Sequence, residues 1–197
     1  MEKYSGVKFK TILNNEILTF DSRLEELKYW CKIFHKKNLA PPYEGGSFGN
    51  LSFRLSPNSN QFIITGSSIG LKEELANDCF VKVTDCDMEK HLVFASGNRN
   101  PSSESMMHYA IYEQRPQINA IFHGHCNKLL QNTNILGIAQ TEKEEDYGTI
   151  QLVNLVLKLS KKDNFLNIKN HGFISLGDSM NEAGVKSVVY NMLSAKF

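Results

Sequence analysis

The sequence has few features that would place the protein in a membrane or carry it out of the cell. Among its 197 residues, no stretch approaches the run of roughly 18 apolar residues that a membrane-spanning helix needs. The first ten residues also lack the apolar segment of a secretory signal peptide. We therefore expect a cytoplasmic, soluble protein without a membrane partner.

Cysteine is scarce and neither sign of charge is in excess. The four cysteines form no C-x-x-C pair, and a chain of this length does not need disulfides to fold. We expect reduced thiols, among which Cys126, directly after His125, is the one that could lie near a metal. The formal net charge is +1 and no basic stripe stands out, so we expect no nucleic-acid partner.

Internal repeats and low-complexity segments are also absent. Apolar residues make up 41% of the chain and charged residues 22%, which is typical of globular proteins. The length is sufficient for one sizeable domain and too short for two comfortable ones. We predict a single domain over residues 1–197, with an N-terminal arm over about 1–20 that forms a short strand or irregular structure.

Apolar periodicity predicts alternating helices and strands. Leu24, Leu27 and Trp30 recur at helical spacing, a serine cap opens a later helix at 101–104, and Pro116 ends it. We expect helices over about 22–37, 102–115, 149–159 and 179–195, with a short helical turn over 72–77. We expect strands over 51–55, 62–65, 80–84, 91–95, 118–125, 165–168 and 172–176. This order indicates an α/β fold in layers, with a mostly antiparallel sheet covered by helices.

The segment His123-Gly124-His125 carries the strongest chemical signal. Alternate residues of a strand point to the same face, so the two imidazoles project together and Gly124 leaves room between them. Each ring needs a polar partner, and a second positive charge nearby is unfavourable, so a divalent metal would resolve the conflict. The alternative is a pair of hydrogen-bonded surface histidines.

A third metal ligand and an acid/base residue must come from elsewhere in the chain. His171 lies between two expected strands, where a structural or surface role is the alternative. His108 lies one helical turn after Glu104 and is a packing residue or a less favoured ligand. Glu104 begins a helix, where the macrodipole favours the ionised carboxylate, and simple helix capping is its alternative role.

Five segments occur together in one order and resemble the class II aldolase/adducin family. Any one of them is a weak signal, but the spacing of P-S-S-E and H-x-H strengthens the set. The segments are Gly46 to Arg54, Ile64 to Ile69, Pro101 to Glu104, Arg115-Pro116 running into Ala120 to His125, and Asn170-His171-Gly172. They cover most of the chain, from about residue 22 to 190.

The resemblance implies a three-layer α/β/α fold and a homotetramer with active sites at subunit interfaces. It implies that His123, His125 and His171 hold zinc, or another divalent metal, and that Glu104 is the acid/base. It further implies a sugar-phosphate substrate, whose phosphate would be bound by six small polar residues. These are Ser47, Asn50, Ser67, Ser68, Ser102 and Ser103. Hydroxyl groups and backbone N–H groups at turns and at a helix N-terminus suit such a dianion.

The resemblance favours reversible aldol cleavage of a ketose phosphate, with zinc as the Lewis acid that stabilises an enediolate. Dehydration, as in methylthioribulose-1-phosphate dehydratase relatives, and epimerisation on the same scaffold are the enzymatic alternatives. A non-catalytic, adducin-like interaction module is the alternative of another class. The loop around Gly66 and Ser68 departs from the usual T-P-x-G. Tyr147 and Tyr190 are candidates for a tyrosine that protonates the departing fragment.

Overall fold

A computed structural model describes residues 6–16 and 21–197, so the first part of the N-terminal arm and residues 17–20 lie outside the description. The helices are α1 (Arg23–Lys36), α2 (Ser105–Gln114), α3 (Asn127–Gln131), α4 (Ile150–Ser160), α5 (Met180–Ser194) and the 3-10 helix η1 (Asn77–Cys79). The strands are β1 (Lys10–Asn14), β2 (Pro42–Tyr43), β3 (Gly46–Ser47), β4 (Asn50–Arg54), β5 (Phe62–Thr65), β6 (Phe80–Asp87), β7 (Leu92–Ser96), β8 (Ala120–Gly124), β9 (Ala139–Gln140), β10 (Phe165–Ile168) and β11 (Gly172–Gly177).

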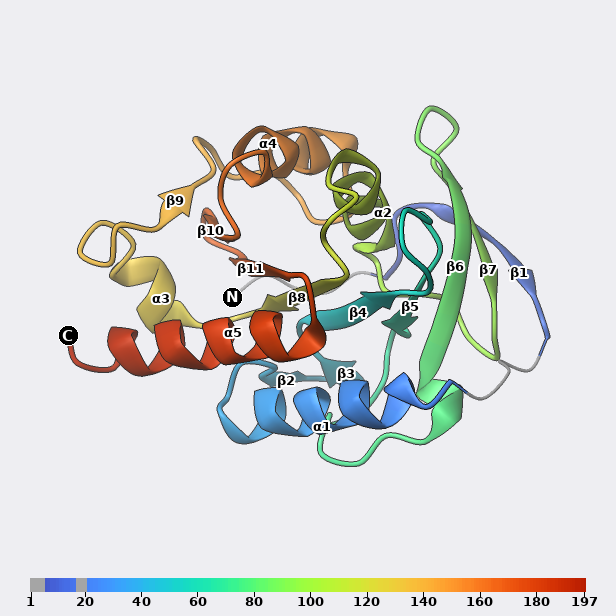
Figure 1. The fold of residues 1–197 in the computed structure, drawn as a ribbon, viewed down its shortest axis with the longest axis horizontal. Helices are drawn as coiled ribbons and strands as arrows, with labels where there is room; N and C mark the ends of the chain where they lie inside the picture. Colours follow the sequence, from blue (N-terminus) through green and yellow to red (C-terminus); the bar gives the residue numbers. More distant parts are fainter. Residues whose placement is uncertain (1–5, 17–20) are drawn as a thin grey trace.

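A nine-stranded sheet forms the centre of the described structure, in the order β1-β7-β6-β5-β4-β8-β11-β10-β9 (Figure 1). The pairs β1–β7 and β9–β10 are parallel, and the other pairs of this sheet are antiparallel. The expected mostly antiparallel sheet is therefore confirmed. The short strands β2 and β3 pair with each other beside it.

Helices cover both faces of the sheet. One apolar core lies under α2 and α4 and includes Met107, Ile111 and Val153. A second core lies under α1 and α5 on the opposite face and includes Leu27 and Phe34. Figure 1 shows α2 and α4 on one side of the strands and α1, α3 and α5 on the other. The α/β/α arrangement of three layers is thus confirmed.

Local signals placed the long helices and the main strands within a few residues of their observed ends, but they predicted none of β2, β3, α3 and β9. The helical turn expected over 72–77 is wrong, because the observed 3-10 helix spans Asn77–Cys79 and Lys72 lies in an irregular turn. The serine cap expected for α2 is also wrong. The cap position belongs to Glu104, whose backbone N–H lies 3.5 Å from Ser102 Oγ.

The described part of the N-terminal arm adds an edge strand. β1 pairs in parallel with β7, with Lys10 opposite Leu92 and Asn14 opposite Ser96. Among the residues that the structure describes, no helix combines the length and apolar character needed to cross a membrane.

Candidate metal centre

Three adjacent strands in the middle of the sheet bring the predicted site together. β8 carries His123 at its end, with β4 on one side and β11 on the other. Asn50 of β4 lies opposite His123 in the register, and so does Ile174 of β11. Because His171 directly precedes β11, the antiparallel pairing of β11 with β8 returns this third imidazole to the pair on β8.

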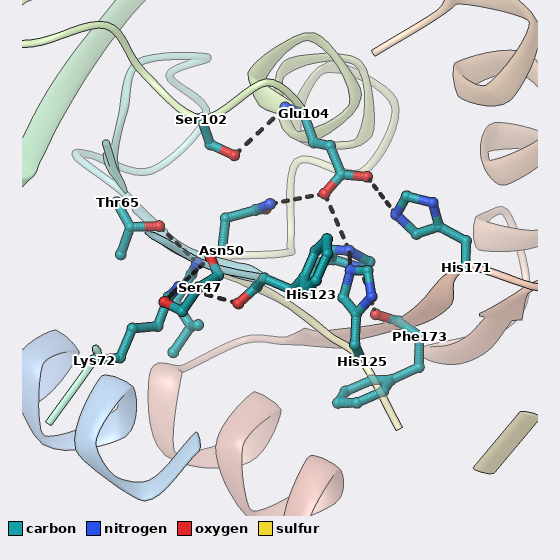
Figure 2. Close-up of polar contacts among 12 residues, drawn as sticks. Ser47, Asn50, Thr65, Lys72, Ser102, Glu104, His123, His125, His171 and Phe173 are labelled. Carbon is teal, nitrogen blue, oxygen red and sulfur yellow. Dashed lines mark hydrogen bonds and ion pairs between the residues drawn. The ribbon is translucent and has the colours of Figure 1, made fainter. Parts of the chain in front are cut away.

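The three predicted histidines form one compact cluster. Their ligand nitrogens lie within 4.8 Å of one another, and His123 Nε2 lies 3.0 Å from His125 Nε2. His123 is fully buried, His171 is 8% exposed, and His125 is half-buried. Figure 2 shows the three rings gathered beneath the carboxylate of Glu104. The sequence-based expectation that residue 171 joins the H-x-H pair agrees with this geometry.

The hydrogen bonding of His123 indicates which of its two ring nitrogens carries the proton. Its Nδ1 lies 2.8 Å from the carbonyl oxygen of Phe173, and a carbonyl only accepts, so Nδ1 carries the proton. In the neutral ring, Nε2 is then an acceptor. It faces a carboxylate oxygen of Glu104 and His125 Nε2, both at 3.0 Å. A cation among these atoms would satisfy them, and a backbone carbonyl behind the ring is the usual support of a ligating histidine.

Close packing restricts the space around the imidazoles. A Cβ atom added at Gly172 would lie 2.4 Å from the Gly124 carbonyl oxygen and 2.8 Å from His123 Cε1. On the open side, Phe48 stacks on the ring of His125, with the ring centroids 4.8 Å apart. The glycines therefore let strands β8 and β11 hold the rings at short range.

Glu104 supplies the negative charge of the cluster. Its carboxylate lies 3.0 Å from His123 Nε2 and 3.2 Å from His171 Nε2, and Asn50 Nδ2 donates to its Oε2 at 2.7 Å. Burial alone would raise the pKa of Glu104. The positive charge that His123 and His171 carry when protonated, together with hydrogen bonds from His171 and the Asn50 amide, holds this pKa well below its usual value. The carboxylate is therefore ionised at neutral pH, as expected from its place at a helix start.

Burial lowers the pKa of His125 well below its usual value, and the neighbouring His123 and His171 lower it further. Neutral imidazole is the form that binds metal. The cluster therefore places the neutral ring of His125 beside two further imidazoles and one ionised carboxylate.

A pocket lined by hydroxyl groups opens beside the cluster. Tyr43 and Tyr147 line it, and so do Glu104, His125 and His171 of the cluster. All six residues predicted to bind phosphate line it, namely Ser47, Asn50, Ser67, Ser68, Ser102 and Ser103. Within the described part of the chain, its lining contains no lysine or arginine.

The two candidate tyrosines and His108 lie in different surroundings. Tyr147 lines the pocket, and its hydroxyl donates to the Gly6 carbonyl at 3.1 Å. Tyr190 instead stacks on Phe165 with centroids 4.1 Å apart and does not line the pocket. His108 is fully buried outside the cluster of three rings, 2.8 Å from Ser52 Oγ, so the packing role expected for it holds.

Sequence reasoning missed Lys72. It is 1% exposed and donates to the pocket-lining residues Ser47 and Phe48. Nothing in the sequence distinguishes it from the surface lysines, because its burial depends on acceptors supplied by a distant turn.

Comparison with known proteins agrees with this geometry. The family profile described as "Class II Aldolase and Adducin N-terminal domain" matches residues 25–194. An L-fuculose phosphate aldolase from Methanococcus maripaludis (strain C5) is 32% identical over 163 residues, which are 75% of this chain and 82% of that protein. A 3-oxo-tetronate 4-phosphate decarboxylase from Haemophilus influenzae is 38% identical over 88 residues, 44% of this chain and 37% of that protein. A solved structure of an L-fuculose 1-phosphate aldolase superimposes with a TM-score of 0.71 at 23% identity, covering 91% of this chain and 85% of that one.

Proposed function

Since this chain belongs to the class II aldolase and adducin family, we propose that it is a metal-dependent lyase that reversibly cleaves the C–C bond of a ketose phosphate. The observation that carries the proposal is the convergence of three imidazoles and one ionised carboxylate at the base of a hydroxyl-lined pocket. As further parts of the proposal, drawn from the family resemblance, the protein is a cytoplasmic homotetramer.

His123, His125 and His171 would hold the metal, and zinc is the ion proposed. Three imidazole nitrogens that leave one coordination position open are typical of catalytic zinc. The fit rests on His123, whose Nδ1–H is held by the Phe173 carbonyl while Nε2 faces the cluster as an acceptor. When bound, the metal would supply Lewis acidity that stabilises the enediolate formed on C–C cleavage.

Glu104 is the proposed acid/base. Asn50 donates to Oε2 and so fixes the plane of the carboxylate, which leaves Oε1 as the oxygen that exchanges a proton with the substrate carbon. Because its pKa is lowered, the Glu104 carboxylate is ionised and can act as the base when the substrate carbon is deprotonated. In the reverse direction the same oxygen returns the proton.

The hydroxyl groups of the pocket are proposed to bind the phosphate. Ser102 and Ser103 precede α2, and Ser67 and Ser68 come from the loop after β5. Ser68 has a φ of 52°, in the left-handed region where glycine is favoured. A serine in this strained conformation on the wall of the pocket supports a role for that segment in ligand binding.

Decarboxylation is the second candidate, favoured by the relative from H. influenzae. Loss of carbon dioxide from a 3-oxo acid and cleavage of a ketose both leave negative charge beside a carbonyl, so the same groups suit either reaction. The products distinguish them, since cleavage of a ketose phosphate releases an aldehyde and decarboxylation releases carbon dioxide. Dehydration would release only water.

The test combines elemental analysis of the purified protein with an aldol-cleavage assay on ketose 1-phosphates. Glu104→Gln should keep its metal and lose about a hundredfold or more of its turnover. Glu113→Gln is the matched control, because it makes the same change at an exposed position of the same helix. Full activity in Glu104→Gln would remove this carboxylate from the mechanism.

A further inference from the structure

Lys72 is a buried cation beside the pocket. It is 1% exposed, and its Nζ donates to Ser47 Oγ at 2.8 Å, to Phe48 O at 3.0 Å and to Ser47 O at 3.2 Å (Figure 2). The three N–H donors of the ammonium group are thus matched by three oxygen acceptors. Among the described residues, however, no carboxylate forms an ion pair with Lys72.

Burying an ammonium without a counter-charge is costly, and burial lowers the pKa of Lys72 to about 8. The group is still charged at neutral pH. The titratable groups whose charges act on it are Cys31 of α1 and His125 after β8. Burial raises the pKa of Cys31 to about 12, so its thiol is neutral at pH 7. Within the described residues, the Lys72 ammonium is therefore held by neutral oxygen acceptors alone and contacts no counter-charge.

The turn that Lys72 holds leads directly to the pocket. Ser47, Phe48, Gly49 and Asn50 all line it. The C=O and N–H groups of a trans peptide point in opposite directions. Because Lys72 binds the carbonyl of Phe48, the N–H of Gly49 points away from the ammonium, as a donor on the other side of the turn. Gly49 has a φ of 77°, which favours glycine there.

We infer that Lys72 is a positioning residue that makes the pocket selective for a dianionic group such as a phosphate monoester, without touching that group. It orients the Ser47–Asn50 turn and supplies the positive charge that the pocket lining lacks. The identity of the substrate in this inference rests on the proposed function. The binding of a dianion does not depend on it.

The test uses zinc-loaded full-length protein and titrates sulfate by calorimetry, because sulfate stays a dianion throughout the neutral range. Lys72→Gln keeps a hydrogen-bond donor and removes the charge, whereas Lys72→Arg keeps the charge. Lys161→Gln removes one charge at an exposed position and is the control for non-specific attraction. Zinc content and circular dichroism are measured on every variant.

We expect Lys72→Gln to bind sulfate at least about tenfold more weakly than the wild type, and Lys161→Gln to bind it equally well. Lys72→Arg should recover most of the affinity. In the cleavage assay, the KM for a ketose phosphate should rise in Lys72→Gln while kcat and zinc content hold. The affinity for an unphosphorylated ketose should not change.

The inference is overturned if folded Lys72→Gln binds sulfate as the wild type does. It is also overturned if weaker binding comes with lost zinc or altered circular dichroism, because Lys72 would then serve folding. If the wild type turns over ketose phosphates and Lys72→Gln has the same KM as the wild type, this inference is refuted and the proposed function is not. Sulfate binding that depends on Lys72, in a protein inactive on every ketose phosphate, would instead remove the proposed function.

Discussion

Gly172→Ala is a sharp test of how the backbone sets the metal geometry. Gly172 begins β11, directly after His171, and lies at the point where β11 meets β8. An added Cβ would lie 2.4 Å from the Gly124 carbonyl oxygen, 2.8 Å from His123 Cε1 and 3.3 Å from His125 Cδ2. One methyl group would therefore press on the peptide between two of the proposed ligands, His123 and His125, and on both of their rings.

The size of the effect follows from these distances. Ordinary contact between carbon and oxygen needs about 3.4 Å, so the two strands must separate by about 1 Å at this point. Zinc–nitrogen distances tolerate only about 0.2 Å. Since His171 moves with β11 and the other two rings move with β8, the three nitrogens can no longer meet one ion at normal distance. We expect zinc affinity to fall by about 10- to 100-fold and the metal-free protein to lose about 1–3 kcal/mol of stability.

Zinc affinity can be measured by competition with a chromophoric chelator, and stability by urea unfolding in EDTA. Gly70→Ala is the matched control, because a Cβ at Gly70 meets no atom within 4 Å. This control should bind zinc as the wild type does. Wild-type zinc affinity in a folded Gly172→Ala protein would show that the rings do not share one ion, and would refute the metal centre as described.

Two further predictions concern the buried polar residues behind the cluster. Burial lowers the pKa of His108 to about 3 in the folded protein. Below pH 6.5 this imidazole is therefore protonated in the unfolded chain and stays neutral in the folded one. As the pH falls from 6.5 to 5, the metal-free protein should therefore lose about 1.6 kcal/mol of stability through His108, and equal urea midpoints at these two pH values would contradict this. Ser52→Ala removes the hydroxyl that lies 2.8 Å from both His108 Nδ1 and the Tyr112 hydroxyl, and should cost about 1–3 kcal/mol in urea unfolding. The exposed Ser56→Ala should cost less than about 0.5 kcal/mol, and an equal loss in both variants would contradict the buried network.

The parts of the site that are local in sequence could be predicted from it. A two-residue period places His123 and His125 on one face, and that inference needs nothing beyond the strand. The position of His171 depends instead on the pairing of β11 with β8, which is a long-range choice. Residue chemistry alone is equally consistent with a structural role for His171. Only the order of several motifs along the chain predicts it as a metal ligand.

Lys72 shows why the rest of the site could not be predicted. The segment over 72–77 is predicted as a short helical turn, and lysines in general lie at protein surfaces. Its burial follows from three acceptors on the Ser47–Phe48 turn, about twenty-five residues away in the chain. Neither periodicity nor composition reports on such an arrangement, because the stabilising partners exist only after β3 and β4 have joined their sheets.

The charges of the proposed complex restrict the substrate further. Neutral imidazoles leave a divalent ion with two positive charges, from which the Glu104 carboxylate removes one and to which Lys72 adds one. A dianionic phosphate balances the remainder, and buried charges are tolerated when they are balanced in this way. A substrate that also carried a carboxylate would leave one negative charge over. The exposed Lys37 and Lys128 line a second cavity, which shares His125 and His171 with the first, so an acidic substrate would have to place its carboxylate there. A neutral second fragment needs no such partner, so the proposed aldol cleavage would require no charged side chain beyond those already described.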